Sequence, residues 1–153
     1  MNKDYIYKAK SLKTGEWIEG YILIWKGMAF ICSEPGTCMN GHEYQMEYLG
    51  FGKFVEVNPN TICRCTGKEY MDSEIAFEGD IMESQTCGLR MLIKYGTYEA
   101  YCPEDKECMD SVGFYAQALG YKDMPIGDLS DYALKVGNIF DNPELMEAGV
   151  KND

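Results

Sequence analysis

The chain contains a single histidine, His42, and it lacks the motifs that usually accompany a catalytic histidine. Hydrolytic triads and most general-base schemes use a histidine that a carboxylate orients toward a nucleophile. No Gly-x-Ser-x-Gly, HExxH, Walker or dinucleotide-binding motif occurs in the sequence. We therefore expect His42 to lie in a surface loop and the protein not to be an enzyme.

Basic residues are also scarce, with 14 Lys and Arg against 25 Asp and Glu, for a formal charge of −11. This balance argues against nucleic-acid binding, which needs a basic stripe that releases counterions from the phosphates. An acidic surface is instead typical of a solvated face or of a patch that binds a protein. The densest acidic run, residues 104–107 with Asp110, is short and interrupted by Lys106. An acidic inhibitor of a DNA-handling enzyme, which would need acids at phosphate-like spacing, is therefore only an alternative.

Long apolar runs are absent as well. The longest, residues 21–25, is far shorter than the roughly 20 residues of a membrane-spanning helix, and residues 1–5 contain no apolar leader segment. We expect a cytosolic protein without membrane contact.

Cysteine is plentiful, but the standard metal-binding spacings are missing. The seven cysteines are Cys32, Cys38, Cys63, Cys65, Cys87, Cys102 and Cys108. Compact zinc sites show pairs separated by two to four residues, and none of these pairs fits. The odd number argues against a disulfide framework, so we expect small buried side chains and no cofactor. A metal held by Cys32, Cys38 and His42 remains the alternative, and with it a metal- or thiol-dependent enzyme.

Alternating apolar and β-branched residues between turn signals predict strands over most of the chain. The candidate strands are residues 4–9, 17–25, 28–32, 43–48, 53–57, 75–77, 80–82, 89–95, 97–102 and 136–140. Gly79 and Asp80 are expected to form a structural corner, and Gly96 the turn of a hairpin. Cys63 and Cys65 would lie on the same face of a strand. The aromatic residues are expected to fill cross-strand pairs and cores.

The expected fold is mainly β: a small barrel or packed antiparallel meander sheets with a short C-terminal helix. That helix runs from Pro143 to about residue 148, with Asn142 as its cap, and a short helix around residues 128–134 is also considered. Residues 107–120 show helical spacing, but Gly113 weakens a helix and favours a strand. We expect one domain, residues 1–153, with lobes 1–55 and 56–149 conceivable. Exposed strand edges in such a fold favour a homo-oligomer.

Four stretches occur in one order and resemble motifs of the YopX family of phage and prophage proteins. They are residues 7–21, which contain Gly15-Glu16-Trp17; residues 52–69, similar to "VxPxTxxxxTG"; residues 77–82, similar to "YEGDIV"; and residues 135–145, similar to "IGNIxxNPEL". Residues 70–75 and 97–128 depart from the family pattern. The motif residues, expected to be structural, are Thr61, Thr66, Gly67, Glu78, Gly79, Asp80, Gly137, Asn138, Asn142 and Pro143.

The resemblance implies a small phage-encoded protein of the host cytosol, and it implies no particular activity. It also places residues 113–116 on a strand facing the strand at 136–140. We therefore expect a non-catalytic accessory protein that binds another protein or itself. The partner is not evident from the sequence.

Overall fold

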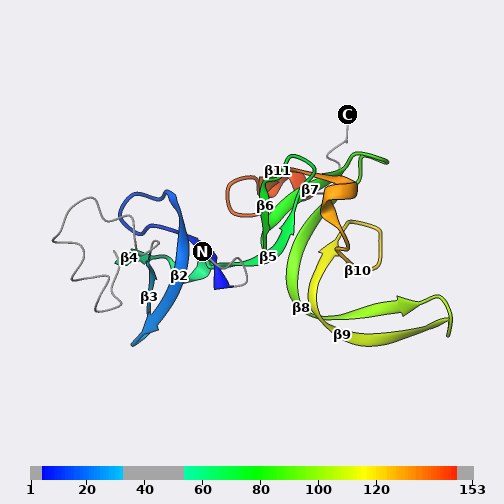
Figure 1. Ribbon diagram of the computed structural model, residues 1–153, viewed down its shortest axis with the longest axis horizontal. Coiled ribbons are helices and arrows are strands. Elements are labelled where there is room, and N and C mark those ends of the chain that lie inside the picture. The colour runs from blue at the N-terminus through cyan, green and yellow to red at the C-terminus, as the bar shows by residue number, and fades with distance from the viewer. Residues whose placement is uncertain (1–4, 33–53, 148–153) are drawn as a thin grey trace. The chain divides into compact units, whose positions relative to one another are not determined.

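The computed structural model describes residues 5–32 and 54–147, which belong to two compact units. Unit 1 comprises residues 1–65 and unit 2 comprises residues 66–153. Antiparallel strands dominate both units, as Figure 1 shows. The prediction of a mainly β fold with antiparallel meander sheets is confirmed.

Unit 1 contains a sheet with strand order β4-β3-β2-β1-β5. Its elements are β1 (Tyr7–Lys10), β2 (Trp17–Trp25), β3 (Met28–Cys32), β4 (Phe54–Val57), the 3-10 helix η2 (Pro59–Thr61) and β5 (Cys63–Glu69). β5 pairs with β1 through Cys63 and Arg64, and its later residues continue into unit 2, where β6 is the neighbouring strand. The predicted strands at 17–25 and 28–32 are confirmed. The candidate at 43–48 lies outside the described residues.

Two glycines of unit 1 are required by local geometry. Lys26 and Gly27 have φ of 49° and 78° and connect β2 to β3 directly, as Trp25 pairs with Met28. Positive φ at both central residues matches the twist of a two-residue hairpin. At Gly20, a Cβ would lie 2.1 Å from the carbonyl oxygen of Cys32. Only glycine permits this approach of β2 to β3.

The core of unit 1 is small and aliphatic. Its buried members are Ala9, Ala29, Ile31 and Val57, against which Ile18 and Ile62 pack. Alternation along β1 and β3 places these side chains on one face of the sheet. Burial of each larger side chain stabilises the unit by about 1.5–3 kcal/mol.

Unit 2 contains a second sheet with strand order β10-β9-β8-β7-β11. Its elements are β6 (Ile75–Phe77), β7 (Asp80–Ser84), β8 (Arg90–Cys102), β9 (Glu107–Gln117), β10 (Met124–Pro125), η3 (Leu129–Asp131), β11 (Ala133–Asn138) and η4 (Pro143–Met146). The core includes Tyr70, Met82, Ile93 and Leu129, each with 1% or less of its surface exposed. The sequence preference for a strand over residues 107–120 is confirmed by β9.

Two local predictions were wrong. Residues 89–95 and 97–102 form the single strand β8 rather than a hairpin, because Gly96 continues the strand with φ of 151°. β11 ends at Asn138 and pairs with β7, so it does not face β9. In the region 128–134, where a short helix was considered, the 3-10 helix η3 covers residues 129–131 and β11 begins at Ala133.

At the C-terminus, the 3-10 helix η4 of four residues stands where a short helix to residue 148 was expected. Asn142 precedes η4 but makes no side-chain capping hydrogen bond to it. Its Oδ1 instead accepts from the backbone N–H of Asn138 at 3.3 Å.

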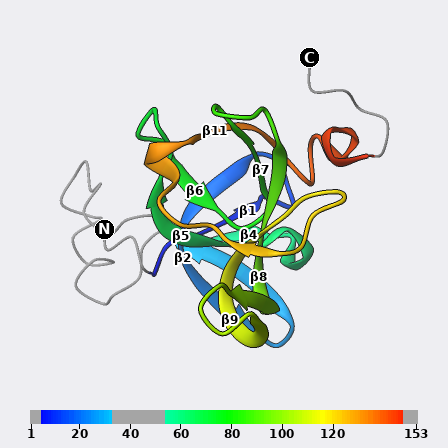
Figure 2. The same cartoon turned by 90° about the vertical axis from the view of Figure 1, so that its right-hand side faces the viewer.

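The β8–β9 hairpin projects from the body of unit 2, and Figure 2 looks along it from its tip. β7 pairs with β8 at Arg90–Leu92, and β10 pairs with β9 at Tyr115 and Ala116. Beyond these contacts, residues 97–102 and 107–112 pair only with each other among the described strands. We call residues 97–112 the arm.

Candidate functional site

A buried polar cluster lies at the corner between β6 and β7. Asp80 is fully buried, and its Oδ2 accepts from the Tyr70 hydroxyl and from the backbone N–H of Phe77, both at 2.9 Å. Its Oδ1 lies 3.6 Å from Lys135 Nζ, which is also 3.5 Å from Glu74 Oε1. We call these four side chains, Tyr70, Glu74, Asp80 and Lys135, the Asp80 cluster.

The electrostatics of this cluster favour a neutral tyrosine. Burial, followed by the charge of Asp80 and its hydrogen bond, raises the pKa of Tyr70 above its ordinary value. Tyr70 therefore stays protonated and serves as a hydrogen-bond donor. Because Asp80 and Tyr70 expose at most 1% of their surface, a substrate has no access to them in this structure. The cluster joins β6, β7 and β11.

The motif around Asn138 also builds a turn. The Oδ1 of Asn138 accepts from the backbone N–H groups of Phe140 and Asp141 at 3.0 and 2.9 Å, and its Nδ2 donates to Asp141 Oδ2 at 2.9 Å. Ile139 N–H donates to the carbonyl of Gly79 at 2.8 Å. The two family-like motifs at 77–82 and 135–145 are therefore in direct contact within unit 2.

The remaining motif residues hold turns as well. Thr61 Oγ1 donates to the Asn58 carbonyl at 2.7 Å and accepts from Lys10 N–H at 2.9 Å. Thr66 Oγ1 donates to the Ala76 carbonyl at 2.8 Å. Gly67 and Gly79 have φ of 75° and 88°, Glu78 precedes Gly79 in its turn, and Pro143 begins η4. The structural role expected for this set stays a prediction.

The predicted metal ligands fall mostly outside the described residues. Cys32 ends β3 and is buried, whereas Cys38 and His42 lie in the part that the structure does not describe. Cys63 and Cys65 are both buried, as same-face residues of β5. Among residues 5–32 and 54–147, no three His, Cys, Asp or Glu side chains are placed to hold a metal ion.

The arm presents an accessible surface. On one face, β8 and β9 contribute directly opposed pairs: Tyr95 with Phe114, Thr97 with Val112, Glu99 with Asp110, and Tyr101 with Cys108. We call the side chains of these eight residues the arm face. It continues the face on which Ile93 and Ala116 are buried in the core. Tyr95 packs edge-on against Phe114, with ring centroids 4.9 Å apart.

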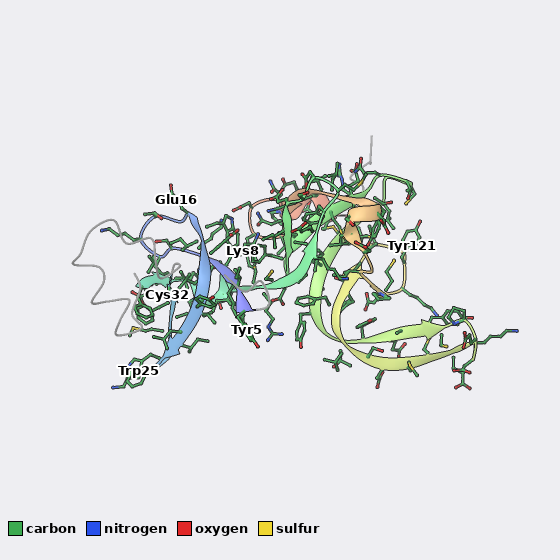
Figure 3. The ribbon with its side chains drawn as sticks, viewed as in Figure 1. Tyr5, Lys8, Glu16, Trp25, Cys32 and Tyr121 are labelled. Carbon is green, nitrogen blue, oxygen red and sulfur yellow. The ribbon has the colours of Figure 1, made fainter. Side chains whose placement is uncertain are left out.

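Large apolar side chains of the arm face are open to solvent. Tyr101 is 55% exposed and Val112 is 72% exposed. A groove of about 370 Å³ lies beside Tyr101 and is otherwise lined by residues 122–125. Figure 3 labels Tyr121, 61% exposed, in the same loop before β10. Exposed aromatic groups beside a groove are typical of binding surfaces.

The charge of the chain is divided unevenly between the two units. Unit 1 has seven basic and seven acidic residues, whereas unit 2 has seven basic and eighteen acidic residues. Unit 2 thus carries the whole formal charge of −11. The arm has one basic residue, Lys106, and five acidic residues: Glu99, Glu104, Asp105, Glu107 and Asp110.

Sequence reasoning missed the arm as a site. Its acidic run and its two strands were recognised, but the turn was placed at Gly96 instead of at residues 103–106. A signal was present, because Pro103 and Asp105 are residue types that favour a turn. Shifting the turn to this position would have paired Glu99 with Asp110.

No protein-family model, curated protein or solved structure matches this chain. The resemblance to the YopX family therefore stays a prediction from the motifs. No helix of the described residues is long and apolar enough to cross a membrane.

Proposed function

We propose that this protein is a non-catalytic protein-binding module and that the arm is its binding element. The observation that carries the proposal is a two-stranded hairpin that leaves the core with exposed aromatic and aliphatic side chains on one face. An isolated hairpin is marginally stable in water, so a projecting one is best explained by a partner that covers it.

The hydrogen bonds of the motif residues also support this proposal. Residues that a catalytic hypothesis would choose, such as Asp80, Tyr70 and Asn138, are engaged in buried hydrogen bonds that hold turns. The arm, in contrast, carries exposed aromatic and aliphatic side chains. The YopX resemblance adds that the protein acts as a phage or prophage accessory protein in the cytosol of the host cell.

A site-specific crosslink tests the proposal. A photoreactive amino acid replaces Val112 on the arm face in one variant and Glu144, an exposed residue of η4, in another. In cells that produce the full chain, we expect one protein to be crosslinked from position 112 and not from position 144. The purified form of that protein should then bind the wild-type chain directly. Absence of any crosslink from position 112, or equal crosslinking from both positions, would contradict the proposal.

A further inference from the structure

The arm face carries two carboxylates in direct opposition. Glu99 of β8 pairs with Asp110 of β9 in the strand register. Side chains that face each other in an antiparallel pair have Cβ atoms about 4.5–5.5 Å apart, and like charges at this separation destabilise the hairpin. Among the described residues, neither carboxylate forms an ion pair or a side-chain hydrogen bond. The free chain therefore keeps a repulsion that an ordinary β hairpin would lack.

Aromatic side chains lie on the same face as this carboxylate pair. Tyr101 follows Glu99 on that face, two residues along β8, and Tyr95 precedes Glu99 by four residues, with Thr97 between them. Both rings are at least 40% exposed. Carboxylates bind a guanidinium group through paired hydrogen bonds, and an aromatic ring binds the face of the same group. These are the two features that recognise arginine.

The arm also selects between possible partners by its charge. With five acids and one lysine, two arms would repel each other, so self-association through the arm is disfavoured. A basic segment would be attracted, and its apolar side chains would meet Val112 and the groove beside Tyr101.

We propose that the arm face binds an arginine-bearing segment of a partner protein, with the guanidinium placed between Glu99 and Asp110 and against Tyr101. This inference rests on the proposed function and adds the chemical class of the partner. It explains why a like-charge pair is kept on an exposed hairpin: the repulsion is relieved when the cation is bound.

The test uses two short peptides and the full chain. One peptide has a central arginine flanked by valine and threonine, and the other replaces that arginine with citrulline, which has a similar shape and no charge. Nuclear magnetic resonance titration of the wild-type chain should show shifts of arm-face amides with the arginine peptide. Affinity for the citrulline peptide should be at least about tenfold lower, because the charge-assisted pair of hydrogen bonds is lost.

Charge-matched variants separate this site from the general acidity of unit 2. Glu99→Gln with Asp110→Asn should lower the affinity for the arginine peptide by about tenfold or more. Glu104→Gln with Glu107→Gln removes the same charge from the same arm but leaves the pair intact, and it should lower the affinity about twofold or less. The urea midpoint of the Glu99/Asp110 variant should equal or exceed that of the wild type, which rules out unfolding as the cause of lost binding.

Three results would overturn the inference: no shift with the arginine peptide, equal affinity for the citrulline peptide, or equal losses in the two charge-matched variants. If a partner is crosslinked from position 112 but any of these three results is obtained, the proposed protein-binding function is retained and only the inference that the partner supplies an arginine is rejected. Absence of the crosslink as well would reject both.

Discussion

Tyr70 and Asp80 show how a buried polar pair stabilises a β-rich unit. The Asp80 carboxylate receives two hydrogen bonds and faces Lys135, so its buried oxygens are satisfied. Replacement of Asp80 removes the acceptor of the buried Tyr70 hydroxyl, and replacement of Tyr70 removes one of the two donors to Asp80 Oδ2. Either loss costs about 1–3 kcal/mol. This arrangement makes the corner between β6 and β7 sensitive to single substitutions and to pH.

We expect the stability of unit 2 to fall at alkaline pH because of Tyr70. Its folded pKa is raised above the ordinary value of 10.0, so the folded chain holds the proton after the unfolded chain has lost it. The contribution is complete below pH 10 and is lost as the pH rises above that value, by up to about 1.4 kcal/mol per pH unit.

Urea unfolding of the wild type and Tyr70→Phe between pH 8 and about pH 11 measures this contribution. Tyr70→Phe should be less stable at pH 8 by about 1–3 kcal/mol, and its stability should fall less steeply above pH 10. All other side chains are the same in the two proteins, so their contributions cancel in the comparison. Parallel curves for the two proteins would show that Tyr70 does not supply the pH dependence.

Position 137 requires a glycine for a steric reason that the motif alone does not reveal. A Cβ at this position would lie 2.6 Å from Asn142 Oδ1 and 2.9 Å from Leu145 Cδ1. Gly137→Ala should therefore destabilise the protein by about 1–3 kcal/mol through overpacking. A double-mutant cycle tests this contact. Chemical denaturation measures the free energy of unfolding of Gly137→Ala, of Asn142→Ala and of the variant that carries both substitutions. The double variant should lose less than the sum of the two single losses, and strict additivity would mean that the Asn142 side chain is not the obstacle.

Among the structural elements, the arm and the core parts of β8 and β9 share strands but differ in environment. A pair of glycines, Gly96 and Gly113, stands in register where the arm begins, with φ of 151° and 156°. These values are rarely adopted by other residues, and a Cβ at either glycine would meet no atom within 4 Å. The glycines are therefore needed for backbone conformation rather than for space.

We expect hydrogen exchange to divide these strands at the glycine pair. Amides at 90–93 and 115–117 are flanked by other strands and a packed core, whereas those at 97–102 and 107–112 pair only across the arm. The arm should thus exchange by local opening, faster by about tenfold or more than the core part of the same strands. Gly96→Ala should accelerate exchange in the arm and leave the amides of unit 1 unchanged. Uniform protection along β8 would contradict this prediction.

The same elements show what the sequence allowed us to predict. β2 and β3 were found because apolar runs are bounded by clear turn residues, as at Lys26-Gly27. β8 was divided incorrectly, since a glycine inside a strand gives the same local signal as a glycine in a turn. The capping role of Asn142 was mistaken because its side chain turns back to accept from Asn138 N–H, a contact that depends on the fold of β11.

The candidate site was harder to predict than the fold. Motif residues such as Thr61 and Asp80 could be interpreted as structural from turn chemistry, and their side chains form hydrogen bonds with backbone groups three residues away. The opposition of Glu99 and Asp110 depends on strand register, and register depends on the position of the turn. A single misplaced turn therefore concealed the arm face.

At the scale of the whole molecule, charge separates the two units. Unit 1 is neutral in formal charge and unit 2 carries −11, so self-repulsion destabilises unit 2 alone. Raising the salt concentration from 0.1 to 1 M shortens the Debye length from about 10 to about 3 Å and screens this repulsion. Salt should therefore stabilise unit 2 and have little effect on unit 1.

The positions of the tryptophans allow the effect of salt on each unit to be measured in the intact chain. Both tryptophans, Trp17 and Trp25, belong to β2 of unit 1, so their fluorescence reports on that unit, whereas far-ultraviolet circular dichroism reports on strands of both. In urea, which is uncharged, the dichroism midpoint should rise with salt and the fluorescence midpoint should stay nearly constant. Neutralising the arm acids Glu104 and Glu107 should reduce the rise, since fewer charges remain to be screened. Midpoints that coincide and move together would mean that the two units unfold as one and that the charge imbalance acts on the whole chain.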